Sequence, residues 1–255
     1  MNNLADFAWI SPAQAVGKFW ILALISLVFG VFGRAVRGVT TSGALAGAIV
    51  SFALLVAAGP AGFAALLMVF LLTWTSTRFG YPRKQSLGIA ERRTGRSAAQ
   101  VAANLGVAAI CALLYVLAWR NSRLLVALVA ALAEAAADTV SSENGQAVGG
   151  TPRLITNWKP APPGTDGAVT VTGTAAGIAA ALAVSLTATA PLGLRAVGGG
   201  WHTAAICTAA AVLGMTADSF LGATAERRGA IGNNTVNFTS TAIAALLAFL
   251  AALLV

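Results

Sequence analysis

Forty consecutive positions in this chain carry no charged side chain: residues 38–77 read GVTTSGALAGAIVSFALLVAAGPAGFAALLMVFLLTWTST. A helix that crosses the hydrocarbon core of a bilayer needs about 20 apolar residues, so this stretch is long enough for two crossings. The pair Gly59-Pro60 interrupts it near its middle, and this pair favours a turn over a continuous helix. We therefore predict a helical hairpin with arms over about 39–58 and 61–77.

The rest of the 255-residue chain is almost as poor in charge. Apolar residues make up 58% of the chain and charged residues 9%, whereas soluble domains contain about 25% charged residues. This composition excludes a soluble globular domain and a disordered chain. Two cysteines and one histidine also exclude a disulfide-rich scaffold and a zinc module. The predicted fold class is all-α, a polytopic transmembrane helix bundle.

Further apolar runs predict six more membrane-spanning helices. They cover about 19–33, 98–119, 123–140, 167–190, 202–217 and 237–255. Together with the two arms of the hairpin they give about eight helices, with seven as the alternative. We expect residues 1–255 to form one integral membrane domain, in which 78–97 and 141–166 are the cytoplasmic loops of the site.

Basic residues are distributed unequally between the two ends of these helices. The connections after the first, third, fifth and seventh helices hold 12 of the 16 Lys and Arg residues. Loops rich in Lys and Arg stay in the cytoplasm, so we expect these connections on the cytoplasmic face of a prokaryotic inner membrane or an organellar membrane. Both termini are then expected outside. The net charge of +8 is thereby assigned to topology and phosphate handling, and no nucleic-acid partner is expected.

Six of the eight acidic residues fall at helix ends or in loops on that same predicted face. They are Glu134, Asp138, Glu143, Asp166, Asp218 and Glu226. Carboxylates in or near membrane spans are costly and usually serve an ion or a substrate, although an ion pair with a nearby arginine is the alternative for any one of them. Glu134 and Asp138 share one helix face because they are four residues apart. Carboxylate and hydroxyl oxygens suit Mg²⁺, which usually arrives with phosphates.

Two further polar motifs lie on this face. The stretch Pro163-Gly-Thr-Asp-Gly167 opens a predicted helix, with Thr165 or Asp166 as N-cap, and a helix N-terminus favours anions. An ordinary capped helix start is the alternative. Arg96, Gln100 and Asn104 recur every four residues and form a polar stripe that could hold a phosphate or join helices.

Glycines and asparagines complete the pattern. Asn233, Asn234 and Asn237 precede the last predicted helix, where they could form a turn or bind a nucleotide. Gly43 and Gly47 form a small-xxx-small pair, which is typical of close helix packing.

Five of these stretches together resemble a known family. They are Gly95-Arg-Ser-Ala-Ala-Gln-Val-Ala-Ala-Asn104, Ala137-Asp-Thr-Val-Ser-Ser-Glu-Asn-Gly145, Gly164-Thr-Asp-Gly-Ala-Val-Thr170, Ala217-Asp-Ser-Phe-Leu-Gly-Ala-Thr224 and Asn233-Asn-Thr-Val-Asn-Phe238. From about residue 20 onward the chain resembles the transmembrane-protein-nineteen family, which includes the plant phytyl-phosphate kinases of the vitamin E pathway. It is more loosely similar to CTP-dependent phytol and dolichol kinases and to phosphatidate cytidylyltransferases. It departs from the family pattern at Leu105, where we expect glycine.

The resemblance implies a membrane-embedded kinase that transfers a phosphoryl group from CTP or another NTP to an isoprenoid monophosphate, such as phytyl or geranylgeranyl phosphate, to give the diphosphate. Asp138, Glu143 and Asp218 would be catalytic and, with Asp166, would bind Mg²⁺. Nucleotide and phosphates would contact Ser141, Ser142, Gly145, Gly164, Thr165, Asp166, Gly167, Asn233, Asn234 and Asn237, and the acceptor phosphate Arg92, Arg96, Gln100 and Asn104. A lipid cytidylyltransferase and a non-catalytic transporter or flippase for anionic lipids are the alternatives, and an oligomer is compatible with all three.

Overall fold

The computed structural model describes residues 12–91, 93–117, 120–192 and 200–254. Seven helices within these ranges are long and apolar enough to cross a membrane, and the predicted all-α transmembrane bundle is confirmed. They are α2 (Pro12–Ala35), α3 (Thr41–Arg78), α5 (Ala98–Leu117), α6 (Ser122–Val148), α7 (Val171–Leu192), α8 (Gly200–Leu221) and α9 (Asn233–Ala251). A short helix α4 (Tyr81–Ser86), a π-helical turn η2 (Gly222–Glu226) and two short strands, β1 (Arg153–Leu154) and β2 (Ala168–Val169), accompany them.

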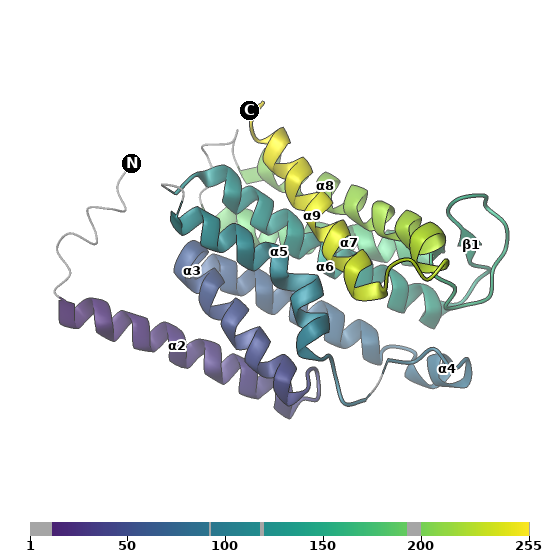
Figure 1. The fold of residues 1–255 in the computed structure, drawn as a ribbon, viewed down its shortest axis with the longest axis horizontal. Helices are drawn as coiled ribbons and strands as arrows, with labels where there is room; N and C mark the ends of the chain where they lie inside the picture. Colours follow the sequence, from purple (N-terminus) through teal and green to yellow (C-terminus); the bar gives the residue numbers. More distant parts are fainter. Residues whose placement is uncertain (1–11, 92, 118–119, 193–199, 255) are drawn as a thin grey trace.

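The central helix of the bundle is α6, which packs against α3, α5, α7, α8 and α9 (Figure 1). Every residue from Leu125 to Ala137 is buried, and many of them are alanines. Packing of small residues drives helix association inside a bilayer, where the hydrophobic effect is absent, so an alanine-rich helix suits this central place. The acids of α6, Glu134, Asp138 and Glu143, are thereby carried into the middle of the bundle.

Both arms of the predicted hairpin lie within α3. At Gly59 the backbone leaves the helical region, with φ +61° and ψ −152°, a conformation that only glycine adopts readily. The chain reverses there, because Ala44 of the first arm and Phe70 of the second both pack beside Phe29-Gly30 of α2 (Figure 1). Each arm is about 27 Å long at about 1.5 Å per residue, close to the thickness of the hydrocarbon core, about 30 Å.

One end of the bundle gathers α4, the β1–β2 ribbon and the turn that joins η2 to α9 (Figure 1). The two strands pair antiparallel, with Arg153 opposite Val169 and Leu154 opposite Ala168. The turn between α2 and α3 belongs to the same end, since Val39 forms a bridge with Arg96 just before α5. This is the end for which the basic residues predict a cytoplasmic location.

Two helices extend further than the sequence predicts. The predicted loop 141–166 begins in fact after α6, which continues to Val148, because no glycine pair or proline interrupts it before Gly149-Gly150. Ser141, Ser142 and Glu143 are therefore helical. Helix α9 begins at Asn233 instead of residue 237, which places all three predicted asparagines on its first turns.

The start of α7 also differs from the prediction. This helix begins at Val171, after β2, and Thr170 caps it by accepting a hydrogen bond from the Gly173 N–H at 3.0 Å. Thr165 is not the cap, since its hydroxyl donates to the carbonyl oxygen of Pro162 at 2.7 Å within a turn. The glycine-bearing segment 163–167 is thus part of a loop that covers the polar end of the bundle.

Candidate functional site

A polar cavity of about 450 Å³ lies at this end of the bundle. Most of the predicted site residues line it: Arg96, Gln100, Asn104, Asp138, Ser141, Ser142, Glu143, Gly145, Gly164, Thr165, Asp166, Gly167, Asp218, Asn233 and Asn237. Asn234 does not line it, and Arg92 lies outside the described residues. Segments from α5 to α9 that are far apart in the sequence therefore contribute to one site.

Two carboxylates from neighbouring helices lie together in this cavity. Asp138 of α6 and Asp218 of α8 are within interaction distance of each other, and Arg96 is the cation that faces Asp138. The Ser240 hydroxyl of α9 donates to Asp218 Oδ2 at 3.1 Å. One turn deeper on α6, Glu134 is 1% exposed, and its Oε1 has no hydrogen-bond partner. The arrangement gathers three carboxyl groups at the inner end of the cavity.

The backbone around Arg96 is fixed to the turn between α2 and α3. The Thr40 N–H donates to the Arg96 carbonyl at 2.9 Å, and the Arg96 N–H donates to the Gly38 carbonyl at 3.0 Å. Gly95 has φ +84°, and a Cβ there would collide with the Gly38 backbone, so glycine permits this close approach. The guanidinium of Arg96 donates to Thr139 Oγ1 at 3.3 Å. It is therefore a positioned cation on the cavity wall.

The other two residues of the predicted stripe have partners within the protein. Gln100 and Ser97 form a capping box at the start of α5, because Gln100 Oε1 accepts from the Ser97 N–H at 2.9 Å and Ser97 Oγ accepts from the Gln100 N–H at 3.4 Å. Gln100 Nε2 donates to Glu91 Oε1 at 3.3 Å. Asn104 is buried and donates to the Gln100 carbonyl at 2.9 Å. These contacts hold the start of α5 in place and leave Arg96 as the member best suited to a phosphate.

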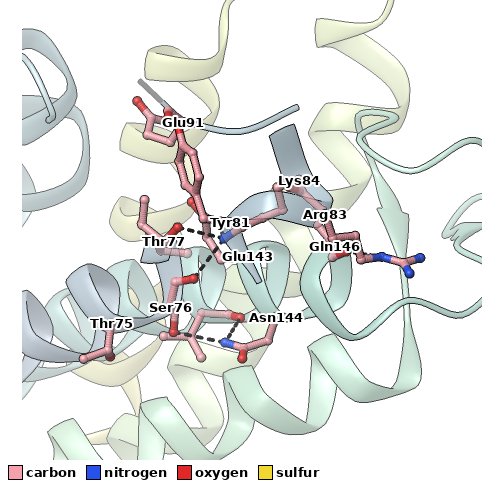
Figure 2. A network of polar contacts seen from close by, with 12 residues as sticks. Thr75, Ser76, Thr77, Tyr81, Arg83, Lys84, Glu91, Glu143, Asn144 and Gln146 are labelled. Carbon is pink, nitrogen blue, oxygen red and sulfur yellow. Dashed lines mark hydrogen bonds and ion pairs between the residues drawn. The ribbon is translucent and has the colours of Figure 1, made fainter. Parts of the chain in front are cut away.

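A buried ion pair at the edge of the cavity joins α4 to α6 (Figure 2). Lys84 is fully buried, and its Nζ lies 2.5 Å from Glu143 Oε2. The same ammonium donates to the carbonyl oxygens of Ser76 and Thr77, at the end of α3, at 3.0 and 2.9 Å. All three of its donors are used. Glu143, a predicted catalytic and metal-binding residue, is therefore held by Lys84.

The structure does not bring the four predicted metal-binding carboxylates together. Among the described residues, no group of three or more His, Cys, Asp or Glu side chains is arranged to hold a metal ion. Glu143 pairs with Lys84, and Asp166 is exposed on the loop before α7, where its charge interacts with Glu226. Asp138 and Asp218 remain as an all-oxygen pair. This pair fits Mg²⁺ that arrives with a nucleotide, because Mg²⁺ is usually held by one or two carboxylates plus substrate phosphates.

Two glycines of the site, Gly164 and Gly167, allow the loop before α7 to pack closely against neighbouring segments. Gly167 has φ +72°, and a Cβ there would collide with Ser219 of α8 and Ala223 of η2. Gly164 has φ +81° and lies against Ile89. The loop before α7 is thereby pressed onto the rim of the cavity, and both glycines are needed for this packing.

Several residues of the site were not predicted. Arg83 lines the cavity, and its Nε donates to the Gln146 carbonyl at 3.3 Å near the end of α6. Lys84 and Arg83 lie in a basic loop, where the positive-inside pattern already accounts for cations, so the sequence carries no separate signal for them. The capping box of Ser97 and Gln100 is different, since the S-x-x-Q spacing indicates it directly.

Three relatives match this chain over most of its length. An uncharacterised membrane protein of Methanocaldococcus jannaschii is 30% identical over 243 residues, which cover 94% of this chain and 97% of the relative. An uncharacterised membrane protein of Synechocystis is 36% identical over 196 residues, covering 75% and 74%. Protein VTE6, chloroplastic, of Arabidopsis thaliana is 28% identical over 248 residues, covering 93% and 73%.

No solved structure matches the chain. The profile of the family described as integral membrane protein DUF92 matches residues 24–245, a range that contains the second half of α2, all of α3 to α8 and the first two thirds of α9. It thereby includes every residue that lines the polar cavity. On this match, the protein belongs to the DUF92 family of integral membrane proteins.

Proposed function

We propose that this protein is a membrane-embedded prenyl-phosphate kinase, which transfers a phosphoryl group from CTP or another NTP to an isoprenoid monophosphate. The observation that carries the proposal is the meeting of Asp138, Asp218 and Arg96 in one polar cavity at the end of an apolar bundle. Phosphoryl transfer requires positioning and charge stabilisation more than a protein nucleophile. The cavity offers these features next to the membrane, where a lipid-anchored acceptor would be held.

In the proposed reaction, an oxygen of the acceptor monophosphate attacks the γ-phosphorus of the NTP. The bond from that phosphorus to the β–γ bridging oxygen breaks, and the NDP leaves with its electron pair. The acceptor oxygen is already anionic, so no general base is required. Arg96 would hold the acceptor phosphate, and Asn233 and Asn237 would contact the nucleoside. Asp138 and Asp218 would hold Mg²⁺, which when bound neutralises phosphate charge.

The choice of acceptor is supported by the resemblance to the transmembrane-protein-nineteen family and its plant phytyl-phosphate kinases. The choice of face follows from the basic residues, since 12 of the 16 lie in connections that belong to the polar end. We therefore propose that the reaction takes place on the cytoplasmic face of a prokaryotic inner membrane, or on the equivalent face in an organelle.

The test is a matrix of donors and acceptors. Purified protein is incubated with Mg²⁺, with CTP or ATP, and with phytyl or geranylgeranyl phosphate. The lipid products are identified by mass spectrometry. We expect the diphosphate, and we expect Asp138→Asn and Asp218→Asn each to reduce its rate on the order of 10²-fold or more. Lys159→Gln, which removes an exposed charge outside the cavity, is the matched control and should keep full activity.

Three outcomes would refute the proposal. If no donor yields the diphosphate, the protein is not this kinase. A CMP-lipid product with release of pyrophosphate would identify a cytidylyltransferase. Movement of an anionic lipid across vesicles without consumption of nucleotide would identify a flippase.

A further inference from the structure

A second cavity, of about 510 Å³, is mostly apolar. Most of its wall comes from α2, both arms of α3 and α5. Phe29, Leu66 and Phe70 contribute large apolar side chains to its wall, and Gly47 contributes only backbone. A Cβ added at Gly47 would meet no atom within 4 Å. The predicted helix packing at Gly47 is therefore not observed, and this glycine faces open space.

This apolar cavity adjoins the polar cavity. Glu91, Arg96, Gln100 and Asn104 line both of them, so the same short stretch of chain forms the wall between a charged compartment and an apolar one. A ligand that spans this boundary needs an anionic group at Arg96 and a hydrocarbon part beyond it. That combination is the chemistry of a lipid phosphate.

The polar end of the apolar cavity is built from stacked cations and aromatic rings. The Arg78 guanidinium lies 4.0 Å from the Trp74 ring centroid, and both side chains donate to the Val36 carbonyl, at 2.6 and 3.2 Å respectively. The Arg93 guanidinium lies 4.7 Å from the Tyr81 ring. All four side chains line the cavity. Cationic and aromatic groups of this kind are typical of the level of lipid headgroups, which gives the cavity a defined polar opening.

The size of the cavity suits one hydrocarbon chain. Its volume of about 510 Å³ lies within the range of roughly 300–1,000 Å³ that is typical of sites for small ligands. A single prenyl chain is a better match to this volume than the two acyl chains of a phosphatidate.

We propose that this cavity is the binding site for the hydrocarbon chain of the lipid phosphate, and that it accepts a single chain with the phosphate at Arg96. The proposal rests on the proposed function for the identity of the acceptor and adds where its chain lies. It also separates the acceptor from diacyl lipids that carry the same phosphate.

The test combines labelling with chain-length selection. Photoreactive C10 and C20 prenyl monophosphates are cross-linked to the protein in detergent, and the labelled peptides are mapped. We expect the C20 label on α2, α3 and α5, and we expect competition by unlabelled geranylgeranyl phosphate but not by dioleoyl phosphatidate. Labelling of other helices, or equal competition by phosphatidate, would overturn the proposal.

Two variants change the volume of the cavity. Gly47→Leu places a side chain in the open space and should lower C20 labelling at least tenfold while C10 labelling persists. Gly17→Leu, at a glycine with equally open surroundings that does not line the cavity, should change neither. Leu105→Ala enlarges the cavity and should raise C20 labelling relative to C10 labelling. Equal effects of Gly47→Leu on C10 and C20, together with no gain for Leu105→Ala, would contradict the assignment.

Failure of this inference can be told from failure of the proposed function. Labelling reports binding without nucleotide. Labelling of the expected helices without any diphosphate product would refute the kinase function and support the lipid site. Product formation with labelling of other helices would support the kinase function and refute the lipid site.

Discussion

The ion pair between Lys84 and Glu143 should be the main attachment of α4 to the bundle. At an effective dielectric constant of about 20, two unit charges 2.5 Å apart attract by about 7 kcal/mol. Desolvation of the two ions offsets most of this attraction, so the net contribution of the pair is small. Removal of one partner is different, because it leaves the other charge buried without compensation, at a cost of about 3–5 kcal/mol.

We therefore expect Lys84→Met to lower the free energy of unfolding by about 3–5 kcal/mol. Glu143→Gln should do nearly the same. The double variant Lys84→Met/Glu143→Met should be less destabilised than the sum of the single changes, because neither charge is then left alone. Arg83→Met is the matched control: Arg83 lies on the same helix and contacts the same end of α6, but it is exposed, so its loss should cost less than about 1 kcal/mol.

The assay is reversible unfolding in mixed micelles with increasing denaturing detergent, followed by circular dichroism. Hydrogen exchange of residues 81–97 reports whether α4 detaches before the bundle unfolds. If Lys84→Met is no more destabilising than Arg83→Met, and exchange in this segment does not accelerate, the ion pair is not what fixes α4.

Two further perturbations test the rim of the polar cavity. Gly167→Ala should lower the free energy of unfolding by about 2–3 kcal/mol in the same assay, since its Cβ would collide with the end of α8. Gly150 has φ +110° but open space around it, so Gly150→Ala should cost less, through backbone strain alone. Equal losses for the two variants would contradict the packing role of Gly167. Asn237→Ala should raise the KM for the nucleotide several-fold in the kinase assay, whereas Asn234→Ala, outside the cavity, should leave this KM unchanged. A larger rise in KM for Asn234→Ala than for Asn237→Ala would show that the nucleotide is bound elsewhere.

The sequence was sufficient for the bundle because a bilayer allows few alternatives. A backbone in hydrocarbon must satisfy its own hydrogen bonds, so length and apolarity predicted each span, and Gly59-Pro60 predicted the reversal. Polar residues were informative for the same reason: they are costly in a membrane protein unless they serve a site or a partner. This is why Asp138 and Asp218, far apart in the chain, were assigned correctly to one end of the bundle.

The prediction of helix packing was wrong at Gly47, because a small residue in a helix can serve close packing or leave a cavity. The two roles differ only in whether a neighbouring segment lies against the residue. Gly43 and Gly47 belong to one small-xxx-small pattern, yet Gly43 lies against the Arg96 backbone whereas Gly47 faces the apolar cavity. The small-xxx-small pattern shows that a side chain is absent, but it does not show whether a neighbouring helix occupies the space. A cavity is therefore hard to infer from a sequence that equally well predicts close packing.

The different surroundings of Glu143 and Asp138 follow from one physical requirement, that a buried carboxylate needs compensation. Lys84 compensates Glu143 fully, with its remaining donors on backbone carbonyls. Arg96 faces Asp138, whereas Asp218 faces Asp138 and accepts from the neutral Ser240 hydroxyl. The two neighbouring carboxyl groups thus share one cation beside the open cavity. A divalent cation that enters with a nucleotide would supply a second positive charge beside Asp138 and Asp218. Glu143 is already compensated by Lys84 and would attract no such ion.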